Sequence, residues 1–321
     1  MNPKVKKIVS YVGTLLMIVS LVFIVRMLMA EIRNEDSYFT LPTSVWVIFG
    51  LVAVATLEGL GILLAGLNFR ALVRNVSGVM ASRALALQVY TESNIYKYIP
   101  GGVMYVAGRN RLAVEEDSLT HGKVALSTVL EGVTMVIGVV VVATVFAFEH
   151  SITYIRTLDI LPVIILIVGL ILMAVAPVLY FLRHRIGGGF KRLTSNMETI
   201  NAFVIFKRVG FGILLMFLYS VTFLLTLMLM GQDMTFQLGF AIIGLYLLAW
   251  LAGFITPGAP SGLGIREAVM MMFLSDFVDV RVLLAAMVMH RILTVGGDFL
   301  AYVAAKIIGK TAANYTPKTQ A

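Results

Sequence analysis

The chain contains no cysteine, which excludes disulfide bonds, thiolate metal ligands and thiol nucleophiles. Charge is also scarce, because 13% of the residues are charged whereas 60% are hydrophobic. The longest polar stretch, residues 183–208, is shorter than the ~50 residues that a small folded domain needs. These scarcities exclude an ordinary soluble protein and predict a single transmembrane domain over residues 1–321.

Signatures of catalysis and of cofactor binding are missing as well. The four histidines have no metal-ligand spacing, and Ser261 with His290 lacks the third partner of a nucleophilic triad. The glycine-rich run 258–264 has no Gly-Lys-Ser/Thr sequence and follows no predicted strand, which excludes a nucleotide-binding phosphate loop. We therefore predict no catalytic residue, no metal and no cofactor, and the sequence does not favour an enzyme.

Long apolar runs are what the chain has instead. A helix needs about 20 apolar residues to cross a bilayer. Six runs meet this length: residues 8–30, 44–67, 122–148, 160–182, 209–230 and 282–307. The first follows three lysines and, at about 23 residues, is too long for a typical cleaved signal peptide, so we expect it to be retained.

Basic residues are unevenly distributed between the connecting segments. They gather before the first span, after the second, after the fourth and at the end of the chain, whereas the opposite loops are mainly acidic. By the positive-inside rule, this pattern predicts a multi-pass protein of the cell (inner, cytoplasmic) membrane with both termini cytoplasmic. The net charge of +8 then reflects topology and lipid contact, and no nucleic-acid motif accompanies it.

Two Pro-Gly pairs interrupt the remaining apolar sequence. Each separates two apolar pieces: 84–99 from 103–113 at Pro100-Gly101, and 238–256 from 263–277 at Pro257-Gly258. Pro and Gly end helices, and unwound backbone at membrane depth is tolerated only inside protein or beside a water-filled cavity. Matching interruptions in two halves of a membrane protein point to a transport site.

Each Pro-Gly pair is followed by an arginine, Arg109 or Arg266, and superposing these segments needs an offset of 157 residues (266 − 109). At this offset, about residues 8–148 and 160–307 each read as span, span, broken pair and span, running in opposite senses. The predicted fold is an all-α polytopic membrane protein with an inverted repeat, followed by a short cytoplasmic tail at 308–321. Two topologies are open: six full spans with two re-entrant hairpins, or eight spans.

The two arginines are the main candidates for binding. Each lies beyond a break, on a helix whose N-terminus faces that break, and a helix N-terminus attracts anions. A guanidinium fork adds bidentate recognition of phosphate, so Arg109 and Arg266 predict a phosphate site. Alternatively, both only satisfy carbonyls freed at the breaks. The other candidates for substrate binding are Lys97, Pro100, Gly101, Pro257, Gly258 and Glu267.

The remaining charges inside apolar segments each need a partner or a cavity, because a charge at the bilayer centre costs about 2.5–3.5 kcal/mol on insertion scales. We expect Glu58 and Glu131 to balance buried arginines or to take part in coupling. Arg291 and Asp298 lie seven residues apart on one helical face, which is compatible with a private ion pair or with a role in coupling.

The residues around both breaks resemble a known family over most of the chain. Segment 93–102, with Gly108-Arg109 after it, is similar to the lysylphosphatidylglycerol synthase transmembrane-region family, also described as flippase-like integral membrane proteins. Segment 257–267 is similar to the family's second signature, a Pro-Gly-rich turn ending in Gly-(Val/Ile)-Arg-Glu, and Glu131 also fits. The run 259–261 (Ala-Pro-Ser) departs from the shorter Gly-Gly-type turn that is common there.

The resemblance implies a lipid translocase, because in the bifunctional synthases this region moves aminoacylated phosphatidylglycerol between leaflets. Their soluble aminoacyl-transferase domain has no counterpart in this sequence, so we expect the chain not to make the lipid. Stand-alone relatives are linked to envelope glycolipid or polysaccharide pathways. The expected partners are therefore membrane lipids, either an anionic phospholipid or a polyprenyl-phosphate carrier, together with envelope biosynthetic enzymes, and not nucleic acid.

These features favour a flippase-like protein that moves an anionic or aminoacylated phospholipid, or a lipid-linked carrier, between leaflets during cell-envelope biogenesis. One alternative is an ion-coupled transporter of a small anion, which an occluded cavity would favour over one open to lipid. The other is an intramembrane transferase or a partner subunit of an envelope glycolipid enzyme, which a base near a bound phosphate would favour.

Overall fold

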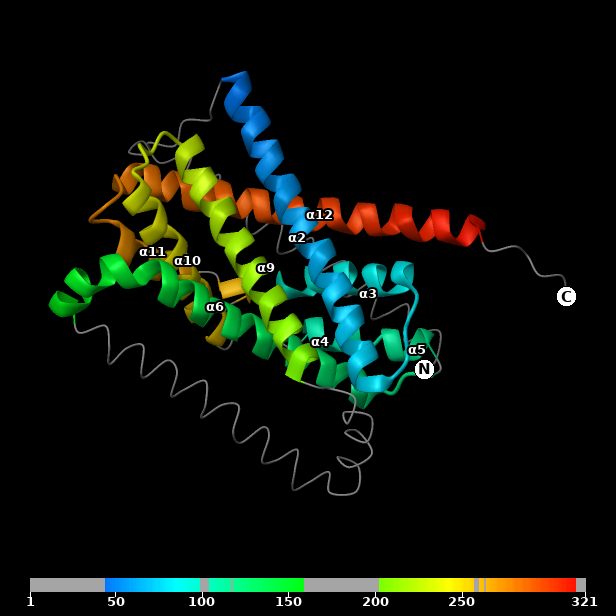
Figure 1. Cartoon of the computed structure of the whole chain (residues 1–321). Helices are drawn as coiled ribbons and strands as arrows, with labels where there is room; N and C mark the ends of the chain where they lie inside the picture. The colour runs from blue at the N-terminus through cyan, green and yellow to red at the C-terminus, as the bar shows by residue number, and fades with distance from the viewer. Residues whose placement is uncertain are drawn as a thin grey trace, which may run out of the picture.

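The computed structural model describes residues 44–98, 104–116, 118–158, 202–256, 260–262 and 264–315 (Figure 1). Within these ranges the secondary structure is helical and contains no strand. Several predicted features lie outside the described residues: the spans 8–30 and 160–182, the pairs Pro100-Gly101 and Pro257-Gly258, and residues 316–321 of the tail.

Five helices in the described ranges are long and apolar enough to cross a membrane. They are α2 (Val45–Ser77), α6 (His121–Leu158), α9 (Ala202–Leu229), α10 (Phe236–Ile255) and α12 (Val280–Tyr315). Large apolar side chains on them, such as Trp46, Phe203 and Phe299, are exposed, as expected of helices that face lipid. The chain is therefore an all-α, multi-pass membrane protein, as the sequence predicted.

Four helices extend beyond the apolar runs that predicted them: α2 past residue 67, α6 past residue 148, α12 past residue 307, and α9, which begins before residue 209. α2 continues past residue 67 to Ser77, because Leu72, Val73 and Val76 in its last turns are buried. It ends where Gly78, at φ 76°, donates its backbone N–H to the carbonyl of Arg74 at 2.8 Å. α12 runs to Tyr315, so the part of the predicted tail from 308 to 315 is helical. Charged side chains lower the hydropathy here before the helices end.

The two broken segments consist of shorter helices. The first comprises α3 (Arg83–Ile95), the 3-10 turn η1 (Tyr96–Tyr98), α4 (Met104–Arg109) and α5 (Leu112–Glu115), and the second comprises α10, the 3-10 turn η3 (Pro260–Gly262) and α11 (Ile265–Leu274). α3 packs against α4, α10 packs against α11, and η1 contacts η3. In Figure 1, α10 and α11 lie on the far side of α9 from α3. The two broken segments meet through their 3-10 turns.

Glycine contacts bring the long helices close together. α2 packs on α12 where Gly59 faces Gly297, and α6 packs on α9 where Gly138 faces Gly212. A Cβ at Gly297 would lie 2.5 Å from the Cβ of Glu58, and one at Gly138 would lie 2.7 Å from the carbonyl carbon of Gly212. A larger residue would force these helices apart, so the α2–α12 crossing sets the position of Glu58 against α12.

The helix contacts of the two halves correspond at the predicted offset, since α2 packs on α12 and α3 as α9 packs on α6 and α10. Because the first predicted helix of each unit lies outside the described residues, the inverted repeat stays a prediction.

Candidate functional site

A cavity of about 430 Å³ lies between the two broken segments. This volume falls in the range of small-ligand sites, roughly 300–1,000 Å³. Its polar lining comes from both halves of the chain: Glu58, Tyr90, Asn94, Lys97, Tyr98, Tyr105, Arg109, Thr128, Glu131, Tyr219, Tyr246, Thr256, Ser261, Arg266, Arg291 and Thr294. Of the charged residues that the sequence indicated, all but Glu267 and Asp298 therefore border one space.

Arg109, the last residue of α4, forms a buried ion pair. Its Nη1 donates to Oε2 of Glu131 on α6, and the Tyr90 hydroxyl donates to Oε1 of the same carboxylate at 2.8 Å. The guanidinium lies 4.3 Å from the ring centroid of Tyr90 and 5.0 Å from that of Phe69. Arg109 is 5% exposed and Glu131 is 2% exposed. Glu131 therefore neutralises Arg109 inside the protein.

Arg266, in the first turn of α11, has a different environment. Its Nη2 donates to the hydroxyl of Tyr246 on α10, and its guanidinium lies 4.4 Å from that ring centroid. Among the described residues no carboxylate lies within 4.0 Å of it, and its Nε has no hydrogen-bond partner. Although it lacks an anionic partner there, Arg266 is buried, with 9% of its surface exposed. Arg266 is thus a buried guanidinium that borders the cavity with only a neutral partner in this part of the chain.

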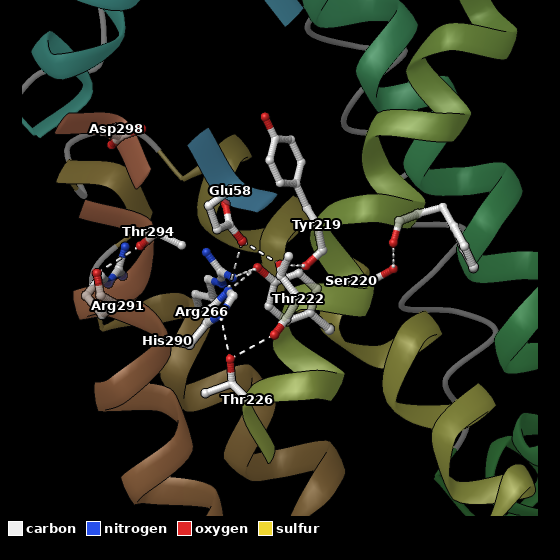
Figure 2. A network of polar contacts seen from close by, with 12 residues as sticks. Glu58, Tyr219, Ser220, Thr222, Thr226, Arg266, His290, Arg291, Thr294 and Asp298 are labelled. Carbon is white, nitrogen blue, oxygen red and sulfur yellow. Dashed lines mark hydrogen bonds and ion pairs between the residues drawn. The ribbon is translucent and has the colours of Figure 1, made fainter. Parts of the chain in front are cut away.

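A series of hydrogen bonds connects Tyr246 on α10 with His290 on α12, Thr226 and Thr222 on α9, and Glu58 on α2. Figure 2 shows Glu58, Thr222, Thr226 and His290 gathered around Arg266. His290 Nε2 lies 2.9 Å from the Tyr246 hydroxyl, and Nδ1 lies 3.3 Å from the Thr226 hydroxyl. Thr226 donates its own proton to the Thr222 carbonyl at 2.8 Å, so it accepts from an Nδ1–H of His290. Because Tyr246 accepts from Arg266, its hydroxyl proton is free to go to Nε2, which makes His290 neutral.

Arg291 on α12 holds the second break in place. Its Nη2 donates to Oε1 of Glu267 at 2.7 Å, and its Nη1 donates to the Ser261 carbonyl at 3.2 Å. The other oxygen of Glu267 accepts from the Gly264 backbone N–H at 2.8 Å. Glu267 thereby caps α11, so the helix N-terminus that we expected to attract an anion already has a carboxylate. Any attraction for an anion here comes from Arg266 itself.

Asp298, two turns further along α12, holds the first break. Its carboxylate accepts from Lys97 Nζ at 2.7 Å, from Asn94 Nδ2 at 2.8 Å and from the Tyr98 hydroxyl. A private pair between Arg291 and Asp298 is therefore wrong, since each pairs with a different broken segment. Lys97, a predicted candidate for substrate binding, lies in an ion pair with Asp298.

The ion pairs account for most of the charge at the cavity. Eight charged side chains from the predicted set lie at or beside it: Lys97, Arg109, Arg266, Arg291, Glu58, Glu131, Glu267 and Asp298. Three pairs, Lys97–Asp298, Arg109–Glu131 and Arg291–Glu267, join six of them. Within the described ranges, Arg266 and Glu58 lack a pair of this kind. In the same ranges no group of three or more His, Asp or Glu residues could hold a metal ion.

Sequence reasoning missed the neutral partners of the two arginines. Tyr90 and Tyr246, which contact Arg109 and Arg266 respectively, were not selected, and His290 was considered only as a metal ligand or nucleophile partner. A signal was present, because adding the repeat offset of 157 to residue 90 gives 247, next to Tyr246. The four Pro-Gly candidates, Pro100, Gly101, Pro257 and Gly258, lie outside the described residues.

The model of the family described as "Lysylphosphatidylglycerol synthase TM region" matches residues 9–301. The chain belongs to this family. The match includes both broken segments and the residues around the cavity, and it suggests a membrane protein linked to the handling of phospholipid or other envelope lipid. A search of curated proteins gave no match to the chain.

Proposed function

We propose that this protein is a flippase-like translocase that moves an anionic or aminoacylated phospholipid, or a lipid-linked carrier, between membrane leaflets. The observation that carries the proposal is Arg266, a buried guanidinium that borders the cavity and has no carboxylate within 4.0 Å among the described residues. A buried cation without an anion in contact with it is costly, and a phosphate group that enters the cavity would give Arg266 a direct charged partner. Membership of the family supports a lipid as the source of that phosphate.

The hairpins supply a polar route for the headgroup. Helix α11 has ten residues and is therefore only about 15 Å long, about half the thickness of the hydrocarbon core. On this account the two broken segments enter the membrane from opposite sides as re-entrant hairpins, and the cavity lies between them. Because α10 has 20 residues and is long enough to cross the core, this arrangement requires α10 to be tilted or to begin outside the core. The lipid tails would stay in the bilayer while the headgroup crosses beside Arg266.

The other charged residues have structural roles in this mechanism. Arg109 with Glu131, Lys97 with Asp298 and Arg291 with Glu267 hold the broken segments against α6 and α12. Phosphate binding is thus assigned to Arg266 rather than to both arginines and Lys97. The mechanism uses no catalytic residue. We further propose an inner-membrane location, both termini in the cytoplasm, and a role beside envelope biosynthetic enzymes.

The direct experiment is reconstitution of the purified chain in vesicles of phosphatidylcholine containing a trace of fluorescent phosphatidylglycerol. Wild type should move the probe between leaflets, and Arg266→Gln should lower the initial rate at least tenfold, since the phosphate would enter without a cation. Arg281→Gln is the control, because Arg281 pairs with Asp279 on the exposed α11–α12 loop and should leave the rate unchanged. A wild type that moves no lipid would contradict the proposal, and uptake of a soluble organic phosphate instead would support the anion transporter.

A further inference from the structure

Three ion pairs join six of the eight charged side chains at the cavity, and Glu58, like Arg266, belongs to none of them. The proposed lipid site does not use Glu58. It lies within α2, is 4% exposed, and has His290 Nε2 at 3.8 Å from its Oε1. Because His290 is neutral in the hydrogen-bond arrangement described above, this contact does not neutralise the carboxylate. An ionised carboxylate buried without a cation is unfavourable unless it takes up a proton or a compensating charge arrives.

The hydroxyl of Thr222 allows Glu58 to exist in both protonation states. It lies 2.5 Å from Oε1 of Glu58 and 2.7 Å from the Tyr219 carbonyl, but it has one proton to donate. With Glu58 ionised, the hydroxyl donates to the carboxylate. With Glu58 protonated, the carboxyl group donates to Thr222 and the hydroxyl turns to the Tyr219 carbonyl. Rotation of one hydroxyl therefore accommodates the proton without leaving a buried donor unsatisfied.

Titratable and charged groups from the neighbouring helices border the same cavity as Glu58 or lie beside it. They are His290, Arg291 and Asp298 on α12, Tyr219 on α9, Tyr246 on α10, Arg266 on α11, Lys97 and Tyr98 on η1, Tyr90 on α3, Tyr105 and Arg109 on α4, and Glu131 on α6. The charges of Arg291, Asp298, Lys97 and Glu131 are already balanced in ion pairs. Arg266 is linked to Glu58 through Tyr246 and His290. The charge on Glu58 therefore acts mainly on Arg266.

We propose that Glu58 takes up one proton for each lipid phosphate that binds beside Arg266, so that lipid movement is coupled to the proton gradient. The inference rests on the proposed function. With Glu58 ionised, the four cations and four carboxylates around the cavity cancel, and a phosphate would add an uncompensated negative charge. With Glu58 protonated, the cavity carries one positive charge, which a singly charged phosphodiester cancels. The loaded site is then electrically neutral, which lowers the cost of burying it.

Calorimetry of lipid binding measures this proton directly. Dioctanoyl phosphatidylglycerol is titrated into the purified protein in buffers of matched pH but different ionisation enthalpy, and the difference in heat gives the number of protons taken up. Wild type should take up about one proton per lipid at alkaline pH, and its affinity should rise as the pH falls, by up to about tenfold per pH unit. Linkage requires both effects together, because the lipid and the proton favour the same state.

Glu58→Gln imitates the protonated side chain in shape and charge. It should bind the lipid without proton uptake, with an affinity that is independent of pH and above that of wild type at alkaline pH. A residue with a merely structural role would weaken binding at every pH instead. Asp233→Asn, which removes an exposed carboxylate in the α9–α10 loop, is the control and should retain the wild-type proton uptake.

Each outcome separates the coupling from the transport. Lipid binding by wild type without proton uptake, or unchanged uptake in Glu58→Gln, would overturn the coupling and leave the lipid site intact. Binding with proton uptake but no movement of lipid in vesicles would support the proton-linked binding and overturn the flippase. Inorganic phosphate serves as the soluble probe: if it binds with the same proton uptake and displaces the lipid, the coupling stands and the cargo is a soluble anion. Absence of lipid and phosphate binding by wild type would overturn both proposals.

Discussion

The two helix breaks carry the same sequence signal, a Pro-Gly pair followed by an arginine, but the arginines lie in different environments. Arg109 is closed off by Glu131, whereas Arg266 contacts the neutral hydroxyl of Tyr246. The difference arises on the helices that pack beside the breaks, because α6 supplies a carboxylate to Arg109 and α12 supplies His290 behind Arg266. The same sequence signal thus occurs once with an arginine paired to a carboxylate and once with an arginine that contacts a neutral hydroxyl.

The largest effect that this comparison predicts is on stability, at Arg109. Arg109→Gln leaves Glu131 buried without its cation and should destabilise the protein by about 3–5 kcal/mol. Thermal denaturation in detergent, followed by size-exclusion chromatography, would show the loss as a lower Tm. Arg266→Gln should cost much less, because it leaves no partner carboxylate unpaired.

A double substitution sharpens the same test. Replacing both Arg109 and Glu131 with Gln removes both charges, so the Tm should return toward that of wild type. If the double variant were no more stable than Arg109→Gln, then Glu131 would not be the partner that makes Arg109 necessary.

The crossing of α2 and α12 predicts a smaller effect. Gly297→Ala puts a Cβ 2.5 Å from the Cβ of Glu58 and 2.9 Å from the Ala55 carbonyl oxygen, and should cost about 1–3 kcal/mol. The adjacent Gly296 is a matched control, because a Cβ there meets nothing within 4 Å, and Gly296→Ala should stabilise the helix by about 0.5–1 kcal/mol. Equal effects of the two substitutions on Tm would contradict the close crossing.

The ion pair between Lys97 and Asp298 should matter less than that of Arg109. Asp298→Asn leaves Lys97 without its carboxylate, but the lysine side chain is 31% exposed and therefore less enclosed than Arg109. We expect a loss of about 1–2 kcal/mol, measured as a lower Tm. A loss as large as that of Arg109→Gln would show that both breaks depend on their ion pairs equally.

The smallest effects are expected from single cysteine substitutions, which test from which side of the membrane each helix break is accessible. The chain has no cysteine, so Gly101→Cys and Ala259→Cys each introduce a single reactive thiol. If the broken segments are re-entrant hairpins, the thiol at 101 should react with a membrane-impermeant maleimide from the cytoplasmic side and the thiol at 259 from the other side. Reaction of both from the same side would exclude the inverted hairpins.

Within the described residues, the sequence was sufficient to predict where the long helices lie, because hydropathy and helix-breaking residues act locally. The runs 122–148 and 209–230 correspond to α6 and α9, and the breaks near residues 100 and 257 separate α3 from α4 and α10 from α11. The ends were less predictable, since α2 continues to Ser77 through contacts with helices that are distant in sequence. Hydropathy does not report those contacts.

The charge partners were not predictable from one sequence. Lys97 and Asp298 are 201 residues apart, and Glu58 and Thr222 are 164 apart, so their contacts depend on how the helices cross. The spacing of Arg291 and Asp298 on one face of α12 suggested that they pair with each other, although they point to different broken segments. Helical spacing shows which side chains are near one another along a helix, but not which other helix approaches them.

The proposed mechanism requires that Arg266, and not Arg109, binds the lipid phosphate. The most direct measurement is the affinity of dioctanoyl phosphatidylglycerol for three purified proteins: wild type, Arg266→Gln, and the double variant with Gln at 109 and 131. We predict that the double variant stays within about threefold of wild type, whereas Arg266→Gln binds at least about tenfold more weakly, which corresponds to the loss of one charge-assisted hydrogen bond. Unchanged affinity in Arg266→Gln, with a loss in the double variant, would contradict the account.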